Sequence, residues 1–254
     1  MTEFTAKIAG YSIRMRVLFP ETKELFHDYL TEEPPLFLIE SSEQKLQDER
    51  QLIMRNDEKG KLSMDCFSDS QIESNYLYRE VAECLSVEGV VLLHGSAIAV
   101  DGEAYIFVAP SGVGKSTHTR LWREVFGKRA VMINDDKPLL KCAEDGIMVY
   151  GSPWNGKHKL GGNLSAPLKA ICFLNRGDEN RIEAISDREA FLPMLKAAYP
   201  SQATEREACI LRSLHCIRRK TAFYQLKCNM EREAAIVAYT GMNTTTKAAS
   251  KPGS

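Results

Sequence analysis

Alternating apolar and polar positions predict a small β-rich region at the start of the chain. From Phe4 to Val17 apolar residues alternate loosely with polar ones, which is typical of strands, and Leu36 to Ile39 predicts another short strand. The highly charged stretch from Ser41 to Lys61 holds at most one more strand, from Gln51 to Arg55. We therefore expect residues 1–72 to form an N-terminal lobe.

Residues 73–240 predict a separate α/β domain, because apolar strand patterns alternate there with helical ones. The turn sequence Asp101-Gly102 lies between two apolar runs and predicts a hairpin, so the sheet is expected to be mixed. A second hairpin is expected around residues 143–146, and residues 241–254, which lack aromatic side chains, are expected to form a disordered tail. Helices are expected at 73–86, 115–126, 187–198, 205–213 and 231–239, and strands at 90–100, 104–109, 130–133, 138–141, 147–150, 168–174 and 221–226.

A phosphate-binding loop is predicted between the strand at 104–109 and the helix at 115–126. The pattern G-x-x-x-x-G-K-[ST] is met from Ala109, which replaces the first glycine, to Ser116. Its backbone N–H groups hold phosphate oxygens, Lys115 reaches the β- and γ-phosphates, and the Ser116 hydroxyl binds Mg²⁺. The predicted nucleotide-binding residues are Ser111, Gly112, Val113, Gly114, Lys115, Ser116 and Thr117.

Two adjacent carboxylates, Asp135 and Asp136, end the predicted strand at 130–133. Proteins with a phosphate loop place the acidic residue that holds Mg²⁺ at such a strand end. One aspartate can therefore hold the metal together with Ser116, while the other accepts a proton from an attacking hydroxyl. Which aspartate has which role is left open.

Three further side chains are candidates for the site. His94 ends an apolar run, and if the predicted hairpin forms, its strand lies near the loop-bearing strand, with the imidazole close to the aspartate pair. The Gly-bracketed loop from 151 to 157 carries Trp154, which could stack on a substrate, and Lys157, which could bind a phosphate or carboxylate. The alternative for this loop is a simple turn with one packed tryptophan. Arg176 is expected to be solvated.

The combination of His94-Gly95, the loop at 111–116 and Asp135-Asp136-Lys137 resembles the HPr kinase/phosphorylase superfamily, whose core also occurs in phosphoenolpyruvate carboxykinases. The resemblance covers roughly residues 90–175 and is greatest to stand-alone serine-kinase-like members. It implies a P-loop kinase core of this type, an active-site histidine at His94, and Asp136 as the aspartate closest to the chemistry. Thr117 replaces an acidic residue usual in HPr kinases, and no counterpart of their substrate-gripping C-terminal loop is found, so HPr is not the expected acceptor.

Composition restricts the partners. The chain has 44% hydrophobic and 26% charged residues, as globular proteins do, and its net charge of -1 gives no general attraction to nucleic acid. The start of the chain lacks a signal-peptide pattern, and the stretch from Gly89 to Val100 is too short to span a bilayer. We expect a cytoplasmic protein without nucleic-acid or membrane partners, and a homo-oligomer is left open.

The seven cysteines have no metal-binding spacing, which suits a reducing compartment. Cys142 and Cys172 are expected to be small buried hydrophobic residues, and His215-Cys216 is expected to serve packing.

These features predict an ATP- and Mg²⁺-dependent kinase that phosphorylates a hydroxyl, either of a serine in a peptide or protein or of a small molecule. His94, Lys115, Asp135 and Asp136 are the predicted catalytic residues. Two alternatives stay open: a nucleotide-binding regulator without catalysis, and a phosphorylase or carboxykinase-like phosphotransferase.

Overall fold

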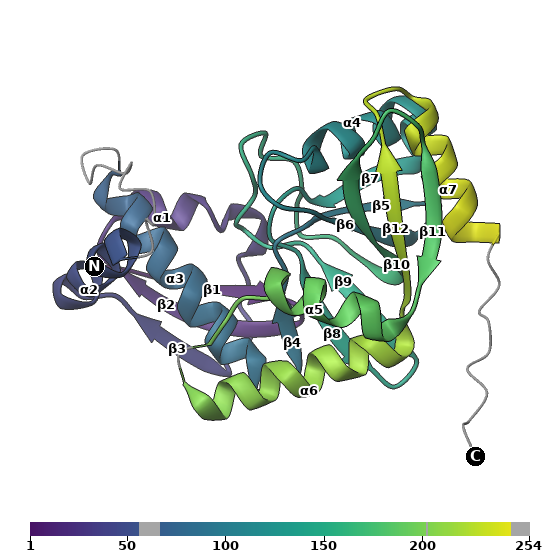
Figure 1. Ribbon diagram of the computed structural model, residues 1–254. Coiled ribbons are helices and arrows are strands. Elements are labelled where there is room, and N and C mark those ends of the chain that lie inside the picture. Colours follow the sequence, from purple (N-terminus) through teal and green to yellow (C-terminus); the bar gives the residue numbers. More distant parts are fainter. Residues whose placement is uncertain (56–66, 202, 245–254) are drawn as a thin grey trace, which may run out of the picture. The chain divides into compact units, whose positions relative to one another are not determined.

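The computed structural model describes residues 1–55, 67–201 and 203–244, which form two compact units (Figure 1). The first unit spans Met1–Glu88 and the second Gly89–Ser254. The division falls later than the expected boundary at 72, so the helix at Asp69–Ser86 is grouped with the first unit.

The first unit is built on a three-stranded sheet in the order β1-β2-β3. The β1–β2 pair is antiparallel and turns at Ala9 and Gly10, both with positive φ, whereas β2 and β3 are parallel. The expected strand at Gln51–Arg55 is wrong, because this segment ends a helix whose buried residues, Leu46 and Glu49, have helical spacing. The elements are β1 (Thr2–Ile8), β2 (Tyr11–Val17), α1 (Pro20–Glu24), η1 (His27–Tyr29), β3 (Phe37–Glu40), α2 (Glu43–Arg55) and α3 (Asp69–Ser86).

The second unit contains a nine-stranded mixed sheet with helices on both faces (Figure 1). Its strands are β4 (Val90–Leu92), β5 (Ser96–Val100), β6 (Glu103–Val108), β7 (Ala130–Asn134), β8 (Leu139–Ala143), β9 (Gly146–Tyr150), β10 (Ser165–Arg176), β11 (Arg181–Ile185) and β12 (Ala222–Cys228). Its helices are α4 (Lys115–Phe126), η3 (Gly127–Arg129), α5 (Asp187–Ala197), α6 (Thr204–Lys220) and α7 (Glu233–Thr244).

Strand order places the loop-bearing strand β6 at the centre of the sheet. β6 is parallel to β10 on one side and antiparallel to β5 on the other, and β5 also pairs with β7. Both predicted hairpins, β5–β6 and β8–β9, are confirmed. An antiparallel strand therefore separates β6 from β7, whose end carries the aspartate pair.

Each face of this sheet has its own hydrophobic core. Leu121 and Trp122 of α4 pack on one face together with residues of α7, whereas Met194 of α5 and Leu214 of α6 pack on the other. Opposed layers of this kind fix the ends of β6 and β10.

Two expectations are modified at the edges of this unit. Cys142 of β8 forms a disulfide with Cys216 of α6, so neither is a free buried thiol. Helix α7 continues to Thr244, so residues 241–244 are helical rather than part of a tail, and residues 245–254 lie outside the described part.

Within the described ranges, no helix has the length and apolar character needed to cross a membrane.

His118 lies in the core directly beneath the loop, on the first turn of α4. Its Nε2 accepts a hydrogen bond from the Trp122 indole at 3.0 Å, and its ring packs edge-on against Phe107. Among the described residues, its buried Nδ1 has no hydrogen-bond partner. Burial lowers the pKa of His118 to about 3, so the ring is neutral in the folded protein.

The His118→Gln variant tests this burial. An unfolded histidine binds its proton near pH 6.5, so the folded state loses stability as pH falls from 6.5 towards the folded pKa of about 3. We expect the wild type to lose about 2 kcal/mol between pH 7 and pH 5 that the variant does not lose. Urea unfolding at the two pH values measures this difference. His215→Gln, at an exposed position on α6, is the control, and equal losses in the wild type and His118→Gln would contradict the assignment.

Candidate functional site

The segment between β6 and α4, predicted to bind phosphate, is a glycine-containing loop that leads directly into a helix. Gly112 and Gly114 adopt φ values of 80° and 127°, which favour glycine, and α4 begins at Lys115 directly after the loop. The unpaired N–H groups of the first helical turn and the helix dipole favour an anion at this point. The predicted strand–loop–helix arrangement is therefore present, and the Ser116 side chain at its end is exposed.

Lys115 is turned back into the protein and has only 9% of its surface exposed. Its ammonium donates to the Ala109 carbonyl at 2.7 Å and lies 3.1 Å from His94 Nε2. Burial lowers the pKa of Lys115, and the negative charge of Asp136 opposes this shift. The ammonium is thus held at the start of the loop by two acceptors.

His94 lies in the short connection between β4 and β5, where the backbone fixes its position. Its N–H donates to the Ala197 carbonyl at 2.7 Å, and the next N–H, of Gly95, donates to the Asp136 carbonyl at 3.0 Å. A Cβ on Gly95 would lie 3.1 Å from the Phe107 carbonyl oxygen, so the connection passes close to β6 because this residue is glycine.

The imidazole of His94 connects Lys115 to the aspartate pair. Its Nδ1 lies 3.2 Å from Asp136 Oδ1, and its Nε2 faces Lys115. An ammonium can only donate hydrogen bonds, so Nε2 is the acceptor and the neutral ring carries its proton on Nδ1, facing the carboxylate. Lys115, His94 and Asp136 therefore form a continuous chain of hydrogen bonds.

The charge of Asp136 is stabilised by this chain. Burial acts to raise its pKa, but the hydrogen bond from His94 and the positive charges of Lys137 and Lys115 outweigh burial and lower the pKa. Asp136 is therefore ionised around neutral pH.

Asp135 points in a different direction from its neighbour. Its side chain is buried, and its Oδ1 accepts a hydrogen bond from the Gly156 N–H at 2.6 Å. Its carbonyl accepts a hydrogen bond from the Ser96 hydroxyl at 3.1 Å. The pair is thus divided: Asp136 faces His94, and Asp135 faces the loop that follows β9.

The Asn134 side chain fixes the backbone around the aspartate pair. Its amide nitrogen donates to the carbonyls of Ser152 and Trp154 at 3.1 and 3.3 Å. Its amide oxygen accepts from the N–H groups of Asp136 and Lys137 at 2.9 and 2.5 Å. This fully buried side chain therefore ties the end of β7 to the loop after β9.

The two candidates in that loop differ in exposure. Trp154 is only 5% exposed, which agrees with the alternative of a turn with one packed tryptophan, and its stacking on a substrate stays a prediction. Lys157 is exposed, and its role in substrate binding stays a prediction.

Arg176, expected to be solvated, contacts the phosphate loop. It lies at the end of β10, and its guanidinium donates to the carbonyls of Gly112 and Val113. The parallel pairing of β10 with β6 brings it there, which a sequence pattern alone does not reveal.

The residues present fit a magnesium–nucleotide complex. Among the described residues, no group of three or more His, Cys, Asp or Glu side chains could hold a metal ion by itself. Mg²⁺ usually takes one or two protein ligands together with phosphate oxygens and water. Ser116 and an aspartate of the pair would hold the metal only together with a phosphate on the loop.

Comparisons with known proteins place the chain in a family. A family model described as "SynChlorMet cassette protein ScmC" matches residues 70–241, and the chain belongs to this family. No curated protein sequence matches it. Among solved structures, it is similar to the HPr(Ser) kinase/phosphatase from Coxiella burnetii, with 9% identity and a TM-score of 0.34 over 60% of this chain and 94% of the other.

The variant Asn134→Ala tests whether the network around Asn134 maintains the site. It removes five hydrogen bonds and leaves buried backbone groups unpaired, so we expect a loss of about 3 kcal/mol in the free energy of unfolding. Urea unfolding measures the loss. Asn175→Ala is the control: its amide has no hydrogen bond among the described residues, so the expected change is below about 0.5 kcal/mol. A loss below about 1 kcal/mol for Asn134→Ala would show that the network is not needed.

Proposed function

We propose that this member of the ScmC family is a Mg²⁺-dependent phosphotransferase that uses ATP and transfers its γ-phosphoryl group to a hydroxyl. The acceptor is a serine of a peptide or protein, or a small molecule. The observation that carries the proposal is the hydrogen-bonded chain of Lys115, His94 and Asp136 next to the predicted phosphate loop. A site that only senses a nucleotide does not require a carboxylate oriented in this way.

The loop accounts for donor binding. The N–H groups of Gly112 to Ser116 hold the phosphates, and the Lys115 ammonium leaves its two internal acceptors to contact the β- and γ-phosphates. Bound Mg²⁺ would supply positive charge that neutralises the phosphates during transfer. Ser116 and Asp135 are the proposed metal ligands from the protein, because Asp136 already faces His94.

Asp136 is the proposed base. The acceptor oxygen forms a bond to the γ-phosphorus while the bond from this phosphorus to the β–γ bridging oxygen breaks, and ADP leaves. The proton of the acceptor hydroxyl goes to Asp136, as in kinases that use an aspartate. The Nδ1 proton of His94 hydrogen-bonds this carboxylate and holds it in position. When Lys115 turns to the phosphates, the imidazole Nε2 loses its hydrogen bond from the ammonium. Positioning and charge stabilisation then supply most of the rate enhancement.

The proposal includes the type of fold. We place the second unit among P-loop kinase cores of the HPr kinase and phosphoenolpyruvate carboxykinase type, on the basis of the central β6, the antiparallel β5 beside it and the aspartates at the end of β7. The N-terminal lobe carries no part of the proposed chemistry.

Transfer from γ-labelled ATP tests the roles of Lys115 and Asp136. Lys115→Ala should lose nucleotide affinity or turnover, because the β- and γ-phosphates lose their cation. Asp136→Asn should still bind the nucleotide but transfer phosphate at least about 100-fold more slowly. Mass spectrometry of free serine, other small hydroxyl compounds and a serine-peptide pool identifies the labelled acceptor.

Each outcome of this assay has a clear consequence. Undiminished turnover by Lys115→Ala would contradict the site, and undiminished transfer by Asp136→Asn would move the base elsewhere. Nucleotide binding without any transfer would favour a regulator over a kinase. Arg181→Ala, at an exposed position on β11, is the control and should match the wild type.

The position of Asp135 gives a second test through the glycine beside it. A Cβ on Gly156 would lie 3.2 Å from Asp135 Oδ2 and 3.3 Å from Asp136 Cβ, so Gly156→Ala should displace the pair. We expect a fall in transfer rate of about tenfold, because a small misplacement of catalytic groups is costly. The control Gly162→Ala lies in the same loop, where a Cβ meets no atom within 4 Å, and should leave the rate unchanged. Equal rates for both variants in steady-state assays would argue against a catalytic position for the pair.

A further inference from the structure

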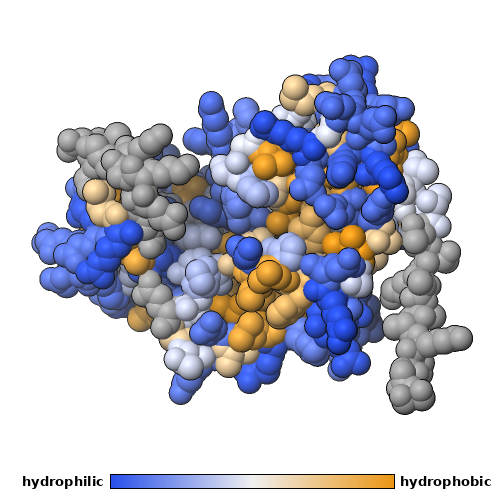
Figure 2. Space-filling view, viewed as in Figure 1, coloured by the Kyte–Doolittle hydropathy of each residue, from blue (hydrophilic) through white to orange (hydrophobic). Residues whose placement is uncertain are grey.

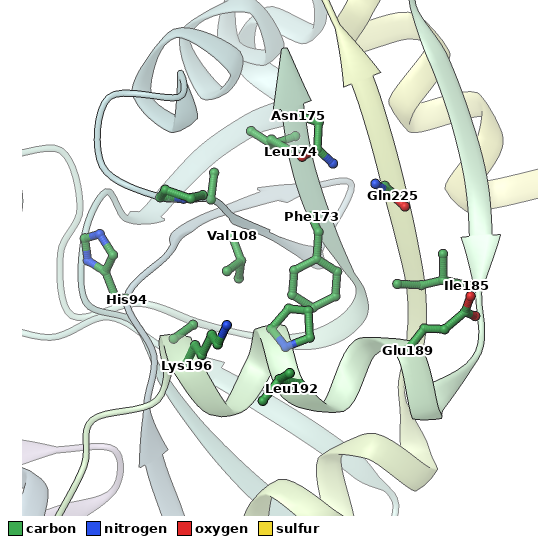
Figure 3. Close-up of a pocket in the computed structure, with 14 residues that line it drawn as sticks. His94, Val108, Phe173, Leu174, Asn175, Ile185, Glu189, Leu192, Lys196 and Gln225 are labelled. Atoms are coloured by element: carbon green, nitrogen blue, oxygen red, sulfur yellow. The ribbon is translucent and has the colours of Figure 1, made fainter. Parts of the chain in front are cut away.

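A pocket of about 490 Å³ opens beside the phosphate loop in the second unit (Figure 3). It lies where β6, β10 and β12 present their side chains to helix α5, and its lining includes Val108 and Ala109 at the end of β6 and Phe173 of β10. Figure 3 shows His94 at one end of the pocket and Ile185 with Glu189 at the other. The pocket is therefore elongated and begins at the proposed catalytic chain.

The end of the pocket at His94 corresponds to the γ-phosphate end of the loop. In a phosphate loop the lysine reaches the β- and γ-phosphates. The Lys115 ammonium contacts Ala109 and His94, and both of these residues line the pocket. A group in the pocket would thus lie next to the transferred phosphate, on the side from which an acceptor approaches.

The walls of the pocket are mainly apolar. Val108 and Phe173 form its buried side, and Leu192 and Pro193 of α5 form its outer side. Leu192 is 56% exposed, and Figure 2 shows apolar surface gathered over α5. When a second apolar group covers an exposed leucine at the mouth of an apolar pocket, apolar surface is removed from water, and this lowers the free energy of the complex.

Polar groups at the pocket are few and are available to a ligand. Among the described residues, Asn175, Gln225 and Lys196 have no side-chain hydrogen bond or ion pair. Glu189 differs, because its carboxylate already accepts hydrogen bonds from the N–H and hydroxyl of Ser186. The two free amides can each donate and accept, which matches the N–H and C=O groups of a peptide backbone.

We infer that the pocket binds a peptide acceptor in which a bulky apolar side chain adjoins the residue that carries the hydroxyl. This inference rests on the proposed function and restricts the class of acceptor to peptides with an apolar residue beside the phosphorylated one. The hydroxyl lies at His94 and Asp136, the apolar side chain lies between Phe173 and Leu192, and Asn175 and Gln225 bind the peptide backbone. Free serine lacks a group that would fill the apolar part of the pocket.

The test compares two synthetic peptides that differ only beside a central serine, which is flanked by leucine in one and by glycine in the other. Values of kcat/KM for phosphate transfer are measured for the wild type, for Leu192→Glu and for Leu211→Glu. Leu211 is a partly exposed leucine on α6 that does not line the pocket, so its variant is the matched control. Nucleotide affinity of each protein is measured separately with a fluorescent ATP analogue.

We expect the wild type and Leu211→Glu to prefer the leucine-flanked peptide at least tenfold, since burial of a leucine side chain supplies a difference of this order. Leu192→Glu should reduce the preference to less than threefold without changing nucleotide affinity.

Three results would overturn the inference. Equal use of both peptides and of free serine by the wild type would refute it while leaving the phosphotransferase proposal intact. If Leu192→Glu loses nucleotide affinity but keeps the peptide preference, the pocket binds the nucleotide donor and not the peptide acceptor. Transfer to no acceptor at all would refute the proposed function, and the inference with it.

Discussion

The site depends on one buried cation. Lys115 is almost fully enclosed, and a buried ammonium is stable only with acceptors and negative charge close by. The Ala109 carbonyl, His94 Nε2 and, through the imidazole, Asp136 meet this need. The same arrangement keeps His94 in one tautomer and Asp136 ionised, so the electrostatic requirement of a single lysine orders three groups from three separate segments.

The topology of the sheet makes this convergence possible. Because β5 is antiparallel to both β6 and β7, the connection before β5 lies at the same edge as the loop after β6 and the aspartates after β7. Gly95 lets this connection approach β6 closely, and Asn134 fixes the end of β7. Helix α5 then closes one side, leaving a pocket that starts at His94. Donor and acceptor would thus meet at one edge of the sheet.

Local sequence signals predicted the elements around this site better than the contacts between them. The loop motif and the Asp101-Gly102 turn depend on residues adjacent in sequence, so both were identified, and His94 lies beside Asp136 as expected. The strand expected at 51–55 was wrong. This segment belongs to a helix with a small buried face, and its many charged residues give only a weak apolar pattern of helical spacing. The contacts of Arg176 and the burial of His118 arise from tertiary packing, for which the sequence carried no periodic signal.

The exchange of partners by Lys115 is tested most directly by the ¹⁵N NMR signals of the His94 ring, recorded with and without Mg²⁺ and a non-hydrolysable ATP analogue. Without nucleotide, the proton should be on Nδ1 and Nε2 should accept from Lys115. One equivalent of nucleotide should shift the Nε2 signal as Lys115 moves to the phosphates, with the Nδ1 proton retained on the Asp136 side. Saturating nucleotide that leaves the Nε2 signal unchanged would show that Lys115 stays in its internal position, and would contradict the proposed site.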